Sequence, residues 1–493
     1  MNKNDMKHRN LPSPLLSLLP IAILVSMLAI TIYLFGSDAL GGGSQICLLT
    51  STGVCVLIGM GGFQRKWKHF EKAITNNISG VATALIILLI IGALSGSWMI
   101  SGVVPTLIYY GIQIIHPNFF LVSTCLICCI VSVMTGSSWT TIATIGIALM
   151  GIGEAQGFAP GWIAGAIISG AYFGDKVSPL SDTTVLAASV TGSSIFSHIR
   201  YLLFTTIPSL IITLIIFTLA GFSHEISDTG NIAEFTQALD NKFQISGWLM
   251  IVPLATAIMI AKRIPSLITL FVSTALATSF AVIFQPNLLI EIAGNTGNHV
   301  LNMIKGSMSI LFGSTNLDAG SAQINELIAT RGMSGMMDTI WLIICAMCFG
   351  GAMTAGGMLE SITHVFTRLA KSRVGMVTST VVSGLFLNIT TADQYISIIL
   401  TGNMFRDIYE GNGYEGRLLG RTTEDAVTVT SPLIPWNTCG MTQATILNVP
   451  TLTYLPYCFF NYISPLMSII IAATGYSIVQ RFVKPKEKNI PNT

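Results

Sequence analysis

Charged side chains are scarce in this sequence, and their scarcity excludes most soluble architectures. Only 9% of the 493 residues are Asp, Glu, Lys or Arg, whereas 52% are hydrophobic. Soluble domains carry roughly 25% charged residues, so this composition does not fit a set of soluble globular units. The formal net charge is +2, and no basic patch is interleaved with aromatic residues. We therefore expect no nucleic-acid partner.

Signals for metal and redox chemistry are also missing. The sequence contains no H-E-x-x-H zinc motif. Its nine cysteines lie mostly inside apolar segments. Cys125 and Cys128 do form a C-x-x-C, but within the apolar run TCLICCIV, where packing explains the sulfur atoms better than metal binding does.

Long hydrophobic runs are what the sequence has instead. Apolar segments of roughly 20 residues, the length that crosses a bilayer, recur along the chain. A helix that is apolar on every face must be surrounded by lipid or by other such helices. The first run is too long for a signal peptide and has no cleavage site, so we expect it to be retained. The sequence thus predicts an all-α integral membrane protein in contact with lipid.

The distribution of charge predicts a topology. Basic clusters mark the cytoplasmic side, and the loop 222–244 is acidic, as an external loop should be. This gives ten crossings of a bacterial inner membrane, with both termini in the cytoplasm and an external loop at 285–336 without assigned function. Arg406, Arg417 and Arg421 do not fit, because this path places them outside. The expected crossings are residues 14–35, 45–63, 73–100, 118–151, 201–221, 246–261, 264–284, 337–366, 374–404 and 455–480.

Two further segments, 160–197 and 418–453, are rich in Gly, Pro, Ser, Thr and Asp and do not fit as crossings. Each must begin and end on one side of the membrane, so we interpret them as re-entrant hairpins with broken helices. Irregular backbone is tolerated at membrane depth only where protein buries it or where it lines a wet cavity.

An internal repeat relates the two halves of the chain at a spacing of about 255 residues. The stretch Gly92–Met99 is similar to Gly351–Met358, and Ser178–Leu180 matches Ser431–Leu433. The charge pattern puts matching points on opposite faces, which predicts inverted repeats with a substrate site between them near the midplane. The predicted organisation is N-terminal helices 1–72, first repeat 73–221, connecting helices and loops 222–336, second repeat 337–480 and a cytoplasmic tail 481–493.

The first candidate ion site is the segment GDKVSPLSDTT. Pro179 removes a backbone donor and frees carbonyl groups beside it, and these can face a cation. Sodium favours such a mixture of carboxylate, hydroxyl and carbonyl oxygens. An ordinary surface turn is the alternative, and Lys176 could neutralise one of the two aspartates. The candidate side-chain ligands are Asp175, Ser178, Asp182 and Thr183.

The second candidate site is the matching segment EDAVTVTSPLIPWNT. Pro432 and Pro435 again interrupt the helix, and polar side chains surround them. Glu424 is either a second carboxylate of this site or a surface residue where the hairpin begins. The candidate ligands are Asp425 and Asn437, supported by Ser431 and Thr438.

Polar residues also interrupt two of the expected crossings, at Thr135–Thr141 and Asn388–Gln394. Serine and threonine in a helix often bond only to the preceding turn, so the first segment is weak evidence. Asp393 is stronger, because a mid-span carboxylate costs roughly 2.5–3.5 kcal/mol to insert; a structural Lys or Arg partner is the alternative. We predict sodium at Asp182, Ser178, Asp393 and Asn437. Supporting residues are Ser137, Ser138, Thr140, Thr391 and Gln394.

The segments GDKVSPLSDTT, TGSSWTT, EDAVTVTSPLIPWNTCG and VPTLTYLPYCFFNYISPL resemble the NhaC family of sodium/proton antiporters, over residues 75–480. The resemblance implies a secondary active transporter that exchanges sodium for protons by alternating access, with no cofactor besides the transported ions. It places Asp175, Ser178, Asp182, Asp393, Asp425 and Asn437 at or near the site. The same family includes carriers of small carboxylates, so the alternative is sodium- and proton-coupled exchange of malate, lactate or amino acids.

Competition for a carboxylate would explain the exchange. Burial favours the protonated form of a carboxylate, whereas bound sodium favours its ionised form.

An intramembrane aspartyl protease built on Asp175 and Asp393 is the enzymatic alternative, but the motif lacks its second glycine. A channel is disfavoured, because buried carboxylates beside helix breaks suit a site occluded from both sides. The sequence leaves a homodimer open.

Overall fold

The protein is described by a computed structural model over residues 11–35, 42–223, 229–294, 297–320, 325, 328–370 and 372–476. The chain termini and the predicted tail 481–493 lie outside the described residues, as do Glu225 and Asp228 of the acidic loop. Within the described residues the regular structure is helical, apart from a single bridge between Thr315 and Thr330. The predicted all-α class is confirmed.

Eight helices in the described part of the chain are long and apolar enough to cross a membrane, or up to ten if two bent pairs each form one span. The bent pairs are Thr236–Lys242 with Gly247–Ala261, at 93°, and Thr451–Tyr457 with Phe459–Thr474, at 55°. These helices make the chain a multi-pass membrane protein. The long helices are α1 (Pro14–Phe35), α2 (Gly43–Phe63), α4 (Ala82–Ile100), α6 (Phe120–Thr135, preceded by the turn Pro117–Phe119), α11 (Ile195–Phe222), α14 (Ser266–Phe284), α18 (Met337–Ala355, preceded by the turn Met333–Met336) and α20 (Arg373–Thr391).

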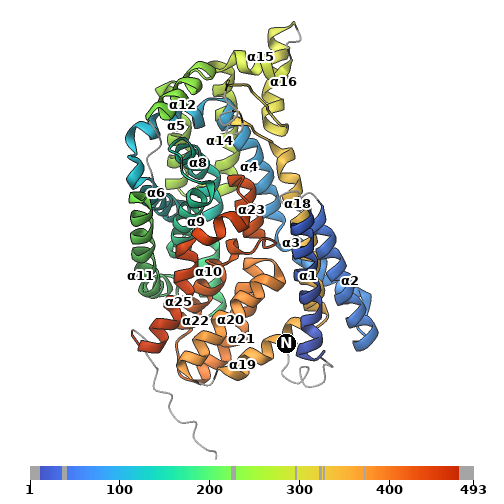
Figure 1. The fold of residues 1–493 in the computed structure, drawn as a ribbon. Helices are drawn as coiled ribbons and strands as arrows, with labels where there is room; N and C mark the ends of the chain where they lie inside the picture. Colours follow the sequence, from blue (N-terminus) through green and yellow to red (C-terminus); the bar gives the residue numbers. More distant parts are fainter. Residues whose placement is uncertain are drawn as a thin grey trace, which may run out of the picture.

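Shorter helices complete the fold, and Figure 1 shows how they are distributed. Helices α12, α15 and α16 gather at one end of the molecule, α19 and α22 lie toward the other, and α1 to α3 run along the side next to α18. The shorter helices are α3 (Trp67–Gly80), α5 (Val103–Ile114), α7 (Ser138–Thr141), α8 (Ile147–Ala155), α9 (Pro160–Val177), α10 (Asp182–Val190), α12 (Thr229–Lys242), α13 (Ile251–Ala261), α15 (Pro286–Ala293), α16 (His299–Phe312), α19 (Met358–Leu369), α21 (Gln394–Gly411), α22 (Gly416–Thr423), α23 (Thr438–Leu447), α24 (Thr451–Tyr454) and α25 (Phe459–Thr474).

The two halves of the chain correspond element by element where they begin. Helices α4 and α18 are each 19 residues long. Each is followed by a glycine in the left-handed conformation, Gly102 at φ 85° and Gly357 at φ 74°, which starts a helix of 12 residues, α5 or α19. Glycine adopts this conformation without the steric penalty that other residues incur. The stretch Gly92–Met99 lies inside α4, whereas Gly351–Met358 runs from α18 to the first residue of α19, so the two similar stretches do not coincide exactly on these elements.

The next pair of elements is broken where polar segments interrupt the expected crossings 118–151 and 374–404. Helix α6 ends at Gly136, at φ 66°, and α20 ends at Ala392, at φ 57°. An extended residue then caps the following helix, Ser137 for α7 and Asp393 for α21. Each expected crossing is therefore divided, because a left-handed residue followed by an N-cap ends one helix and starts another.

The packing of the segments that were predicted as crossings and hairpins can be described from their neighbours. Helices α20 and α21 pack against each other near one end of the molecule (Figure 1). In the predicted hairpin 418–453, α22 packs against α10, α11, α20 and α21, whereas α23 packs against α4, α8 and α18. Its two arms thus pack mainly against different helices. Which segments cross the bilayer stays a prediction.

Candidate functional site

A buried carboxylate at the helix break after α9 is hydrogen-bonded through both of its oxygens. Asp175, near the end of α9, is 5% exposed. Its Oδ2 accepts hydrogen bonds from the Ser138 backbone amide at 3.2 Å and from the Ser138 hydroxyl at 2.6 Å. Its Oδ1 accepts one from the Ser181 hydroxyl, also at 2.6 Å. Asp175 therefore joins the start of α7 to the residue that caps α10.

The other predicted residues of this break lie around Asp175 in different ways. The Thr183 hydroxyl is 2.9 Å from that of Ser181, so it belongs to the same group of oxygens. The Ser178 hydroxyl donates to the Val133 carbonyl at 2.8 Å and so links the break to α6. The side chain of Asp182, in contrast, is exposed. It lies at the start of α10, close enough to Asp175 and Tyr395 for its charge to act on both, and its role as a sodium ligand stays a prediction.

The second break has its carboxylate on a different element. Asp393 is 1% exposed and caps α21, accepting a bond from the Ile396 amide at 2.9 Å. Its other oxygen accepts the Thr438 hydroxyl at 3.2 Å. The Thr438 amide donates to the Ala392 carbonyl at 2.8 Å, and the Asn437 side chain caps α23 through the Cys439 amide. Asp393 therefore joins the start of α21 to the start of α23.

Backbone carbonyls and amide side chains fix this second junction. The Asn437 amide donates to the Asn388 carbonyl at 3.1 Å, and the Trp436 ring nitrogen donates to the Ile389 carbonyl at 2.8 Å. The Ser431 hydroxyl bonds Gln394 at 3.2 Å. Thr391, whose hydroxyl bonds both the Asp393 carbonyl and the Ser397 hydroxyl, stabilises the turn itself.

The first junction repeats this pattern with other residues. The Thr135 hydroxyl bonds the Ser137 carbonyl at 3.1 Å and the Thr141 hydroxyl at 3.2 Å, as Thr391 does at its own turn. The Ser137 hydroxyl caps α7 by accepting from the Thr140 amide and hydroxyl. Gly136 has no room for a side chain, because a Cβ atom there would lie 2.6 Å from the Leu180 backbone.

Contacts between the repeats bring the two junctions together. The Gln443 amide of α23 donates to the Tyr172 hydroxyl of α9 at 3.2 Å. Tyr395, in the first turn of α21, lies near enough to Asp175, Asp182 and Asp393 for their charges to act on it. Among the described residues, however, no hydrogen bond joins Ser178 or Asp182 to Asp393 or Asn437. Since ligands of one cation need not bond one another, the four-residue sodium site stays a prediction.

Lys176 forms a buried ion pair with Asp425, and both side chains are fully buried. The Ser464 hydroxyl donates to the same Asp425 oxygen at 2.6 Å, and Thr205 does so at 3.3 Å. The expectation that Lys176 neutralises an aspartate of its own segment is wrong, because its partner comes from the other repeat. Asp425, predicted as an ion ligand, already has a cationic partner.

Sequence reasoning left Glu424 open between the site and the surface and did not place Arg421 or His198 in the interior, yet all three are fully buried. The interpretation of Glu424 as a surface residue is therefore wrong. Arg421 was one of the arginines that the charge pattern could not place, and its burial accounts for that misfit. The guanidinium lies over the Tyr201 ring, 4.7 Å from its centroid.

A family model described as the Na+/H+ antiporter family matches residues 170–476, which include the breaks after α9 and α20. The chain belongs to this family. It is 37% identical to the Na(+)/H(+) antiporter NhaC of Alkalihalophilus pseudofirmus, over 86% of this chain and 90% of the relative. It is 36% identical to the malate-2H(+)/Na(+)-lactate antiporter of Bacillus subtilis, over 87% and 89%. It is 33% identical to the arginine/ornithine antiporter ArcD of Halobacterium salinarum, over 94% and 93%. The predicted resemblance to the NhaC family is confirmed.

Two features bear on where this member of the Na+/H+ antiporter family could bind an ion. No group of three or more His, Cys, Asp or Glu side chains in its described residues could hold a metal ion, so a cation would need hydroxyl or carbonyl oxygens as well.

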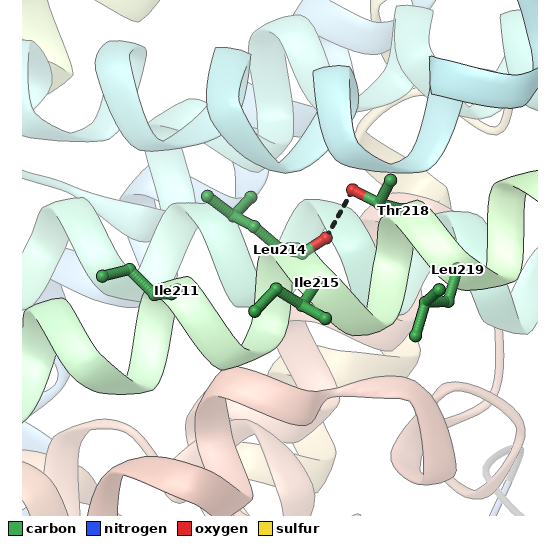
Figure 2. Close-up of a pocket in the computed structure, with 5 residues that line it drawn as sticks. All are labelled: Ile211, Leu214, Ile215, Thr218 and Leu219. Atoms are coloured by element: carbon green, nitrogen blue, oxygen red, sulfur yellow. Dashed lines mark hydrogen bonds between the residues drawn. The ribbon is translucent and has the colours of Figure 1, made fainter.

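A pocket on α11 is apolar (Figure 2). The Thr218 hydroxyl there is bonded to the Leu214 carbonyl, and Ile211, Ile215 and Leu219 are more than half exposed. This surface suits lipid contact rather than ion binding.

Proposed function

We propose that this protein exchanges sodium ions for protons by alternating access across the bacterial inner membrane, with both termini in the cytoplasm. Membership of the Na+/H+ antiporter family supports the exchange. The proposal is assigned to particular residues because Asp175 is a buried carboxylate that accepts hydrogen bonds from hydroxyl groups at a helix break. Broken helices at repeat interfaces are where secondary transporters bind coupling ions.

Sodium would bind beside Asp175 and take oxygen ligands from Ser138, Ser181 and Thr183. These hydroxyls now donate to the carboxylate or to each other. A hydroxyl that turns its proton outward offers an oxygen lone pair to a cation, so the same side chains can serve either an empty or an occupied site. A proton on Asp175 would remove the charge that holds sodium, and the two ions would compete.

Asp393 would complete the exchange site from the second repeat. Its carboxylate holds the Thr438 hydroxyl at the start of α23, and Asn437 is the adjacent helix cap. A cation between the two junctions would attract both carboxylates and draw α21 toward α9. Loss of the cation, or protonation of the carboxylates, would release that attraction, which is the differential interaction that alternating access requires.

Exchange of small carboxylates or amino acids together with sodium and protons is the second candidate. The names of the Bacillus subtilis and Halobacterium salinarum relatives favour it. Lys176, which could have attracted a substrate carboxylate, is paired with Asp425 instead. The enzymatic alternative has less support, because Asp175 and Asp393 accept hydrogen bonds from different partners, whereas an aspartyl dyad shares one proton.

Purified protein in proteoliposomes with an imposed pH gradient tests the proposal. Addition of sodium alone should dissipate the gradient, whereas potassium or choline should not. Malate, lactate, arginine and ornithine are then added singly with sodium present. Dissipation that requires one of these solutes would establish the second candidate, and a gradient that none of the additions changes would contradict both. A homodimer can be tested on the same preparation by cross-linking in the lipid bilayer.

A further inference from the structure

A second group of buried ionisable side chains lies next to the proposed sodium site and takes no part in it. Within the described residues, both carboxylate oxygens of Glu424 lack a hydrogen-bond partner. The same is true of three guanidinium nitrogens of Arg421 and of both ring nitrogens of His198. All three side chains are fully buried. Since buried polar groups in proteins are nearly always bonded, this group needs a functional or solvent explanation.

Glu424 is the member of this group that faces the ion site. It begins the π-helical turn Glu424–Thr428, which packs against α9, α10, α20, α21 and α25. The charges of Asp175, Lys176 and Asp425 all act on it. Thr428 is close, but its hydroxyl makes no hydrogen bond of normal geometry. Other charges lie close by: Asp182 (α10) acts on Asp175, Arg421 (α22) acts on Lys176, and Asp393 acts with Asp175 and Asp182 on Tyr395 (α21). Asn388 (α20) bonds the Val427 carbonyl of the same turn, and Ser464 (α25) bonds Asp425.

The surroundings of Glu424 suit a neutral side chain. Lys176 and Asp425 neutralise each other, so neither offers Glu424 a free counter-charge. An ionised carboxylate without donors, deep in a membrane protein, has lost the hydration that stabilises it. A carboxylic acid in the same place has no net charge to desolvate. The described arrangement is therefore the one expected when Glu424 carries a proton.

The geometry points to Glu424 as a proton-binding group that is separate from the sodium site and linked to it by the charge at Asp175. This inference rests on the proposed sodium/proton exchange. A sodium ion that arrives beside Asp175 adds a positive charge that stabilises ionised Glu424, so the O–H bond breaks and its proton passes to water when the site opens. A proton that returns makes Glu424 neutral again and weakens sodium binding. The proton bound at Glu424 then moves in addition to any proton exchanged at Asp175.

The test measures protons released by purified protein when sodium is added in weakly buffered detergent solution, with choline as the blank. Glu424→Gln imitates the protonated side chain, so it should fold and should still bind sodium. We expect it to release about one proton fewer per bound sodium than the wild type, and its sodium affinity to depend less on pH. Glu424→Asp, which keeps a titratable group, should restore the release. Glu410→Gln, at an exposed residue paired with Arg406, is the matched control and should be unchanged.

The possible results distinguish a failure of the proposed role of Glu424 from a failure of the proposed sodium/proton exchange. Equal proton release by Glu424→Gln and wild type would overturn the role of Glu424 and leave the proposed exchange intact. Absence of sodium-linked release from the wild type would overturn the exchange and this inference with it. If Glu424→Gln does not fold, infrared difference spectra of the wild type take its place. Loss of two protonated-carboxyl C=O bands on sodium addition to the wild type, one of which lies at a different frequency in Glu424→Asp protein, supports Glu424; loss of one band or of none contradicts it.

Discussion

At the scale of single residues, the buried aspartates of this chain differ in their surroundings. Asp175 accepts hydrogen bonds from a backbone amide and two hydroxyls, and Asp393 from one amide and one hydroxyl. Asp425 shares its charge with Lys176, and Asp182 is exposed. The same Asp→Asn substitution should therefore have different consequences at each position, because it removes an ion ligand in one place and a salt-bridge partner in another.

Asp175→Asn should abolish sodium-dependent proton movement. The substitution keeps the size of the side chain but removes the charge and turns one acceptor into a donor that faces the Ser138 or Ser181 hydroxyl. We expect exchange in proteoliposomes to fall about 100-fold or more, which corresponds to roughly 3 kcal/mol of lost interaction. Glu410→Gln, at an exposed residue paired with Arg406, is the control and should stay within about threefold of wild type, since an exposed charge contributes little. Exchange by Asp175→Asn at a rate near that of the control would refute the proposed ion site.

Lys176 and Asp425 should behave as a structural pair. Lys176→Met leaves a buried, unpaired carboxylate and should destabilise the protein by roughly 3–5 kcal/mol, and Asp425→Leu should do the same by leaving the ammonium group unpaired. The double variant removes both charges and should recover most of the stability. Thermal unfolding in detergent measures this, with exchange assayed on the same samples. Additive losses in the double variant would show that the two side chains do not depend on each other.

At the scale of elements, sequence reasoning located the helix breaks but not how the chain continues after them. The polar segments around Ser178, Asp393 and Asn437 were predicted because Pro, Gly and hydroxyl residues interrupt apolar runs. Local signals of that kind do not reveal which arms pack side by side, and here it is α20 and α21 that do. The partner of Lys176 could not be predicted from local signals either, because Asp425 lies 249 residues away in the chain.

The two left-handed residues that end α6 and α20 should respond in opposite ways. At Gly136, alanine would need a left-handed conformation that costs about 1–2 kcal/mol and would also place Cβ 2.6 Å from the Leu180 backbone. Gly136→Ala should therefore lower both thermal stability and exchange. Ala392→Gly relieves the same penalty at φ 57°, offset by roughly 0.5–1 kcal/mol of glycine entropy, so stability should be unchanged or slightly higher. A tolerated Gly136→Ala would mean that the contact with Leu180 does not fix the turn.

At the scale of the whole molecule, the candidate site belongs to neither half of the chain alone. Tyr172 and Lys176 on α9 find their partners on α23 and on the turn after α22. Each repeat thus contributes a carboxylate at a helix break, and the contacts between the repeats hold the two breaks near each other. Relative movement of the repeats would have to exchange these contacts, so alternating access and ion binding depend on the same residues.

The topology of the membrane protein can be tested at the acidic and basic ends of one helix pair. Asp240 on α12 and Lys262 after α13 are both exposed, and the chain between them bends by 93°. The positive-inside rule predicts that the acidic side faces the periplasm and the basic side the cytoplasm. A membrane-impermeant maleimide should therefore label Asp240→Cys in intact cells and Lys262→Cys only after permeabilisation. The native cysteines in the described residues are buried, apart from the partly buried Cys348, so the unmodified protein is a suitable blank. Labelling of both variants from the same side would contradict the ten-crossing arrangement with its termini in the cytoplasm.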